Sequence, residues 1–129
     1  MLKLTYIETG FYLESLAQSL EEWVALRVVF ALRLSDRIYV ESSTAAFLLP
    51  ADLPGLNLLA DEVKRQGTDE IELCICDAEY IEVILKGTWL ATKAESANGV
   101  FVAALSYSTE CLLMKLWHCT QIGASVLSD

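Results

Sequence analysis

The fold depends on how one stretch is interpreted, SLEEWVALRVVFALRL at residues 19–34. It opens with a capping box, because Ser19 and Glu22 have the spacing that satisfies the first backbone donors of a helix starting at Leu20. From Val24 to Leu34, however, large apolar residues occupy every second position, and this period in branched residues is typical of a strand. We predict a strand from residue 23 to 34. The alternative, a helix begun by Ser19, would mean that the capping box outweighs the alternation.

The other strands follow from the same two-residue period and from turn residues. Ser35-Asp36 supplies a turn between the first two members of an antiparallel hairpin. Gly87 suits a bulge within a long strand of a second hairpin, and Asn98-Gly99 is a turn signal that leads into the last strand. The predicted strands lie near residues 2–8, 23–34, 37–42, 70–76, 80–91 and 100–106.

Two helices are predicted from apolar stripes and their caps. Residues 50–55 are rich in proline and glycine, which interrupt regular structure. After them, Leu56, Leu59 and Val63 fall on one helical stripe, and Gly67 lies where a left-handed cap is expected. Near the C-terminus, Ser108 can cap a second helix that ends before Gly123. These helices lie near residues 54–66 and 109–121.

These elements predict a single α+β domain over residues 1–129. Its sheet is mainly antiparallel, and two or three helices pack on one side of it. A chain of 129 residues is of one-domain size, and it contains no repeat, linker or low-complexity segment.

The composition excludes some partners and favours one. Nine basic against 18 acidic residues give a net charge of −9, which leaves little from which to build a nucleic-acid surface. Hydrophobic residues make up 54% of the chain, against about 45 to 50% in ordinary domains, so we expect self-association, with a dimer as the simplest form. The uncharged runs at 96–109 and 116–128 are too short for a membrane span, and no signal peptide is recognisable, so we expect a cytoplasmic protein.

The cysteines and acidic residues do not have the spacing of a metal site. Cys74 and Cys76 share one strand face, whereas Cys111 and Cys119 would lie about 12 Å apart along a helix. We therefore expect reduced thiols and no bound metal. The carboxylates between Asp69 and Glu82 lack a calcium-loop pattern and are interpreted as a solvated face.

No pattern of catalytic residues is present. His118 is the one histidine, no nucleophile motif accompanies it, and the six glycines form no phosphate-binding loop. We predict no catalytic residue and no cofactor. Trp23, Trp89 and Trp117 each border an apolar run and are expected to be buried anchors.

The least ordinary cluster is basic. Arg27 and Arg33 would share one face of the predicted strand, with Arg37 just past the turn. Such a cluster could bind an anionic group, although pairing with carboxylates such as Glu41 is the commoner arrangement.

Several stretches together resemble a family of small uncharacterised proteins from cyanobacteria. They are residues 19–24 and 47–54, followed by Cys76-Asp77-Ala78-Glu79-Tyr80 and Lys115-Leu116-Trp117. The resemblance covers nearly the whole chain. It implies a soluble cytoplasmic protein of a photosynthetic bacterium and assigns no activity.

The sequence therefore favours a non-enzymatic homo-oligomer that acts as an interaction or accessory protein. The alternative is a small anionic-ligand binder, or an enzyme, with a pocket at one end of the sheet and the Arg27, Arg33 and Arg37 cluster as its anion site.

Overall fold

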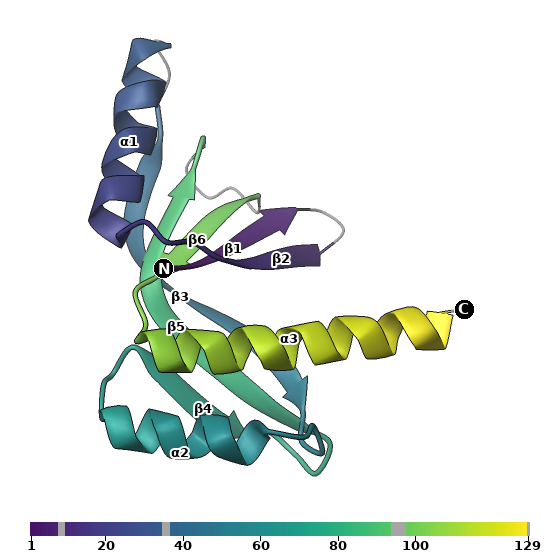
Figure 1. Ribbon diagram of the computed structural model, residues 1–129. Helices are drawn as coiled ribbons and strands as arrows, with labels where there is room; N and C mark the ends of the chain where they lie inside the picture. Colours follow the sequence, from purple (N-terminus) through teal and green to yellow (C-terminus); the bar gives the residue numbers. More distant parts are fainter. Residues whose placement is uncertain (8–9, 35–36, 94–97, 129) are drawn as a thin grey trace. The chain divides into compact units, whose positions relative to one another are not determined.

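The structure is a computed structural model that describes residues 1–7, 10–34, 37–93 and 98–128 (Figure 1). It is an α+β fold, as predicted, with antiparallel strands and three helices in the described ranges. In chain order the elements are β1 (Leu2–Ile7), β2 (Gly10–Ser15), α1 (Leu20–Arg33), β3 (Tyr39–Pro50), α2 (Leu56–Gln66), β4 (Ile71–Ile75), β5 (Tyr80–Ala91), β6 (Gly99–Ala103) and α3 (Tyr107–Ser128).

The chain divides into two compact units. Unit 1 contains residues 1–44 and 86–104, and unit 2 contains residues 45–85 and 105–129. The strand order is β2-β1-β6-β5-β3, with β4 also paired to β5. Strands β3 and β5 each contribute one part to unit 1 and the other part to unit 2.

In unit 1, β1 lies between β2 and β6 and pairs antiparallel with both. Leu4 is opposite Leu13 on one side and Phe101 on the other, and all three side chains are buried. The predicted first strand is confirmed. None of the predicted elements covers β2, which is a strand because it pairs with β1 along its whole length.

The predicted strand from residue 23 to 34 is wrong, because this segment is helix α1. Ser19 adopts an extended backbone, and its Oγ accepts a hydrogen bond from the backbone N–H of Glu22 at 3.2 Å. Acidic residues in the first turn and Arg33 in the last turn complement the helix dipole. The alternation was a weak strand signal because the intervening positions, Ala25, Val29 and Ala31 among them, are also apolar.

The hairpin predicted from that strand is therefore also wrong. Residues 35–36, its predicted turn, lie outside the described residues. The partner predicted at 37–42 is a longer strand, β3, which runs on to Pro50.

Unit 2 contains the elements that were predicted best. Strands β4 and β5 form the predicted antiparallel hairpin, with Leu73 opposite Val83. The turn between them is closed by Asp77, whose Oδ1 accepts hydrogen bonds from the backbone N–H groups of Glu79 and Tyr80 at 2.7 and 2.9 Å. Helix α2 is confirmed, and Gly67 caps it in the left-handed conformation at a φ of 63°.

Helix α3 packs beside α2 (Figure 1) and differs from its prediction at both ends. Its cap is Ser106 rather than Ser108: the Ser106 Oγ accepts a hydrogen bond from the backbone N–H of Thr109 at 3.2 Å. The helix also continues through Gly123 to Ser128. Its buried Leu113 and Leu116 belong to the core of unit 2.

Two glycines of unit 1 are required by close packing rather than by a turn. A side chain at Gly87 would overlap the carbonyl oxygen of Val102, and one at Gly99 would lie 2.6 Å from the carbonyl oxygen of Leu90. Strand β6 runs from Gly99 to Ala103, so Gly99 belongs to the strand and not to the predicted turn before it, and the strand ends before the predicted residue 106. Residues 94–97 lie outside the described residues.

Candidate functional site

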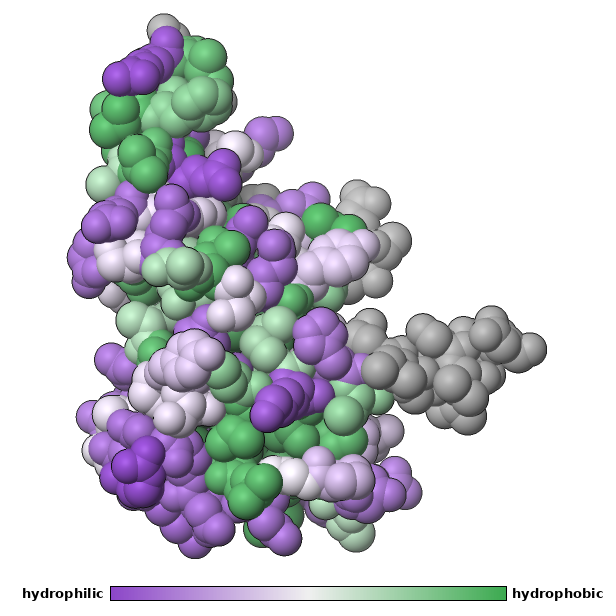
Figure 2. All heavy atoms as spheres, viewed as in Figure 1, coloured by the Kyte–Doolittle hydropathy of each residue, from purple (hydrophilic) through white to green (hydrophobic). Residues whose placement is uncertain are grey.

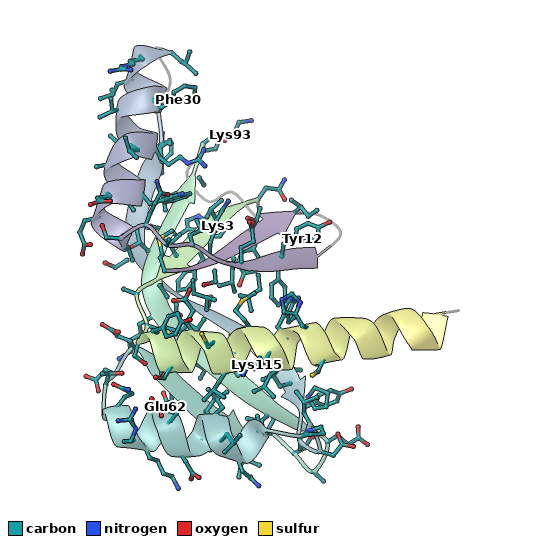
Figure 3. All side chains as sticks on the ribbon, in the orientation of Figure 1. Lys3, Tyr12, Phe30, Glu62, Lys93 and Lys115 are labelled. Atoms are coloured by element: carbon teal, nitrogen blue, oxygen red, sulfur yellow. The ribbon has the colours of Figure 1, made fainter. Side chains whose placement is uncertain are left out.

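Among the described residues, the outer side of α1 gathers several large exposed apolar side chains. Only Trp23 and Ala31 of this helix are buried. The large side chains Leu26, Val29, Phe30 and Leu32 are 60%, 46%, 59% and 68% exposed, and we call these four residues the α1 apolar face. Figure 2 shows hydrophobic residues gathered along α1, and Figure 3 labels Phe30 on this helix.

The inner side of α1 is anchored on the sheet by Trp23. This side chain is buried in a cluster with Leu90 and Val102, which are also buried. Val24 and Ile38, which are half-buried, pack against the same cluster. One side of α1 thus belongs to the core of unit 1, and the opposite side presents apolar side chains to solvent.

Two cations lie over the Trp23 ring. The Arg27 Cζ atom is 4.9 Å and the Lys3 Nζ atom 5.7 Å from the ring centroid, within the range of cation–π contact. Lys3 also pairs with Glu14, at 3.7 Å between Nζ and Oε1. Sequence reasoning missed Lys3, because its place beside Trp23 depends on the tertiary packing of Trp23 against Leu90 and Val102.

These cations line a crevice of about 390 Å³ between α1 and the sheet. Thr5, Thr92 and Asn98 supply polar groups to its lining. The remaining lining residues are mainly apolar, among them Trp23, Ile38, Leu90 and Val100. A second groove, of about 410 Å³, runs along one flank of α1 and is lined by Trp23, Leu26, Arg27 and Phe30 together with Arg33.

The predicted arginine cluster is rearranged by the helix. Arg27 and Arg33 were expected on one strand face, but six residues along a helix place them about 120° apart around its axis. Arg27 turns toward Trp23, Arg33 lies exposed in the last turn, and Arg37 is exposed before β3. Of the three, only Arg27 is among the residues that line the crevice.

The other tryptophans are half-buried and lie in aromatic pairs. The Trp89 ring meets Tyr6 edge-on at 5.6 Å, in unit 1. The Trp117 ring meets Phe47 edge-on at 6.1 Å, in unit 2. The expectation of buried anchors is confirmed for Trp23, whereas Trp89 and Trp117 bury only part of their surface.

The cysteines and the histidine, which are the residue types that bind zinc, are spread over unit 2. Cys74 lies on β4, Cys76 just beyond it, and Cys111, His118 and Cys119 on α3. Within the described ranges, no group of three or more His, Cys, Asp or Glu side chains comes together as a metal site. All four cysteines are free thiols, and Glu70 and Glu72 are exposed.

Fold and surface together define a small antiparallel α+β protein that exposes four large apolar side chains on α1. The chain belongs to the Alr0857-like family, whose model matches residues 1–121. No curated protein and no solved structure matches the chain. In the part of the chain that the structure describes, no helix combines the length and the apolar character that crossing a membrane requires.

Proposed function

We propose that this protein is a non-enzymatic homo-oligomer, in its simplest form a dimer, that acts as an interaction or accessory protein. The observation that carries the proposal is the α1 apolar face, in which four large side chains on two successive turns are about half exposed or more. Contiguous apolar patches on soluble proteins commonly mark interaction sites. Burying such a face against a second copy would remove its apolar area from water.

Charge supports the choice of this surface. The chain as a whole carries a net charge of −9, so two copies repel each other on balance. Helix α1 carries Glu21 and Glu22 against Arg27 and Arg33, and is therefore neutral. Association through α1 keeps the excess of acidic groups away from the contact.

We place the protein, as part of the same proposal, in the cytoplasm of a cyanobacterium. Four free thiols suit a reducing compartment. Membership of the Alr0857-like family agrees with the resemblance drawn from the sequence.

Sedimentation velocity tests the proposal, at chain concentrations from about 1 to 100 µM, where interfaces of modest size associate. We expect a species of twice the 14.3 kDa chain mass for the wild type. Val29→Glu places a charge within the α1 apolar face and should give a monomer. Leu58→Glu, at a 62% exposed position on α2, is the matched control and should remain a dimer.

A wild-type monomer at every concentration would overturn the proposal. So would a Val29→Glu variant that dimerises as well as the wild type, because the α1 apolar face would then not be the contact.

A second candidate function is favoured by the crevice between α1 and the sheet. Its volume, its mainly apolar lining and its two cations suit a small organic acid. In this form the anion site consists of Lys3 and Arg27, not of the three arginines. A thermal-shift screen with carboxylates tests it: a ligand at 100 times its dissociation constant adds about 2.7 kcal/mol of stability, and Lys3→Met with Arg27→Met should abolish that shift.

A further inference from the structure

A stripe of four residues runs along the outer side of α1. Glu22, Leu26, Val29 and Arg33 are spaced four, three and four residues apart, which is the spacing of a heptad seam. Glu22 and Arg33 are eleven residues apart, so they lie only about 20° apart around the helix and about 16 Å apart along it. The stripe therefore has an apolar centre with an acid at one end and a base at the other.

We propose that α1 pairs antiparallel with α1 of a second copy, about a twofold axis that passes midway between Leu26 and Val29. This inference rests on the proposed dimer and specifies its contact. Around that axis Leu26 meets the partner's Val29, and Val29 meets the partner's Leu26. At each end, Glu22 of one copy meets the partner's Arg33.

Charge selects this arrangement over the parallel one. A parallel pair would set Glu22 against the partner's Glu22, and Arg33 against the partner's Arg33, so both ends would repel. The antiparallel pair turns both ends into opposite-charge contacts. The same charges indicate that the partner of α1 is a second copy of the chain. A second α1 has an arginine and a glutamate eleven residues apart, which is the separation that Glu22 and Arg33 require.

The flanks of the stripe fit the same pairing. Phe30 lines the groove of about 410 Å³ together with Trp23 and Arg27, and the stripe residues Leu26, Val29 and Arg33 line it too. A twofold axis perpendicular to both helices brings like flanks together, so the partner's Phe30 approaches this groove. On the opposite flank, Leu32 of one copy approaches the small Ala25 of the other.

Charge reversal tests the pairing, with the dimer dissociation constant measured by sedimentation on the full chain. Glu22→Arg sets two arginines together at both ends, and Arg33→Glu sets two glutamates together. Each should raise the dissociation constant by about tenfold or more, because two contacts per dimer change from attraction to repulsion. The double variant Glu22→Arg with Arg33→Glu restores opposite charges and should return to within about threefold of the wild type.

Glu21→Arg is the matched control. It makes the same change of charge in the same helical turn, but Glu21 lies about 100° around the helix from Glu22 and off the stripe. Its dissociation constant should stay within about threefold of the wild type. Circular dichroism of each variant verifies that α1 is retained.

The outcomes separate this inference from the proposed function. If Val29→Glu abolishes the dimer but both charge reversals leave it unchanged, the α1 dimer stands and the antiparallel pairing is overturned. If the double variant stays as weak as the single ones, the pairing of Glu22 with the partner's Arg33 is also overturned. A wild-type chain that is monomeric at every concentration overturns both the proposed dimer and the antiparallel pairing. The α1 apolar face would then bind a different protein.

Discussion

Ser19 determines where α1 begins. Its side chain satisfies the backbone N–H of Glu22, one of the four donors that a helix start leaves without an intrahelical acceptor. We expect Ser19→Ala to lower the free energy of unfolding by about 1 kcal/mol, and Ser19→Asp to retain most of it. Urea denaturation followed by circular dichroism measures both. A Ser19→Ala variant as stable as the wild type would show that packing of Trp23 alone holds the helix start.

Gly87 is required by space. A methyl group at this position would overlap the Val102 carbonyl oxygen, and it would lie 2.8 Å from Cζ of Phe101. We expect Gly87→Ala to cost about 1 to 3 kcal/mol, because two strands or the Phe101 ring must shift. The comparison is Gly67→Asn at the C-cap of α2. Gly67 has open space around it and a left-handed backbone that asparagine tolerates. That variant should lose clearly less, as judged by the midpoint of chemical denaturation.

Among the elements, α2 carries a pH-dependent contact on its last turns. Arg65 donates hydrogen bonds to both carboxylate oxygens of Glu62, and Gln66 donates one at 2.9 Å. These bonds hold the pKa of Glu62 below its usual value. Because the folded pKa is lowered, the contact stabilises the fold above the unfolded pKa and is lost as pH falls through the folded one.

The expected result is a stability difference between wild type and Glu62→Gln that depends on pH. The wild type should melt at the higher temperature at about pH 7, and the gap should narrow as the pH falls below the ordinary glutamate pKa and through the lower pKa that Glu62 has in the folded state. Thermal unfolding at a series of pH values measures it. Asp61→Asn, an exposed position on the same helix, controls for the removal of a charge. A gap that stays constant down to the lowest pH would contradict the role of Glu62.

The elements also differ in how far their sequences predict them. Helix α2 and the β4–β5 hairpin carry local signals of the right kind: an apolar stripe, a left-handed Gly67 and an Asp77 turn. Strand β2 has no such local signal, and its conformation depends on pairing with β1. In α1 two local signals conflict, and the cap is the better guide because a strand with apolar residues on both faces would need cover on both.

The conflict between the capping box and the alternation in residues 19–34 also made the prediction of the candidate site wrong. As a strand, residues 23–34 place Arg27 and Arg33 together and suggest an anion site. As a helix, they set Arg27 and Arg33 about 120° apart around the axis, although both still line one groove, and they align Glu22, Leu26, Val29 and Arg33. The contact of Lys3 with Trp23 joins β1 to α1. No local sequence pattern in either segment predicts this contact.

At the scale of the whole molecule, we predict that the purified protein contains no stoichiometric zinc. Zinc binds thiolates, and burial together with the charge of Glu72 raises the pKa of Cys74. Cys111 and Cys119 are eight residues apart on α3, which is about 12 Å along its axis. Elemental analysis after exhaustive dialysis checks the prediction. One zinc per chain that is lost in Cys74→Ser would contradict it.

The pairing of β1 with β6 has a consequence for the order in which the chain folds. Leu2 pairs with Ala103, so β1 leaves the ribosome about 100 residues, and its neighbour β2 about 90 residues, before the end of β6 does. At about 5 to 20 residues per second, the first hairpin waits about 5 to 20 s with one edge open. Such long-range pairing makes folding slow, because the loop must close before the contacts form. During that interval Leu2 and Leu4, which are fully buried in the folded chain, lack the β6 strand that pairs with them.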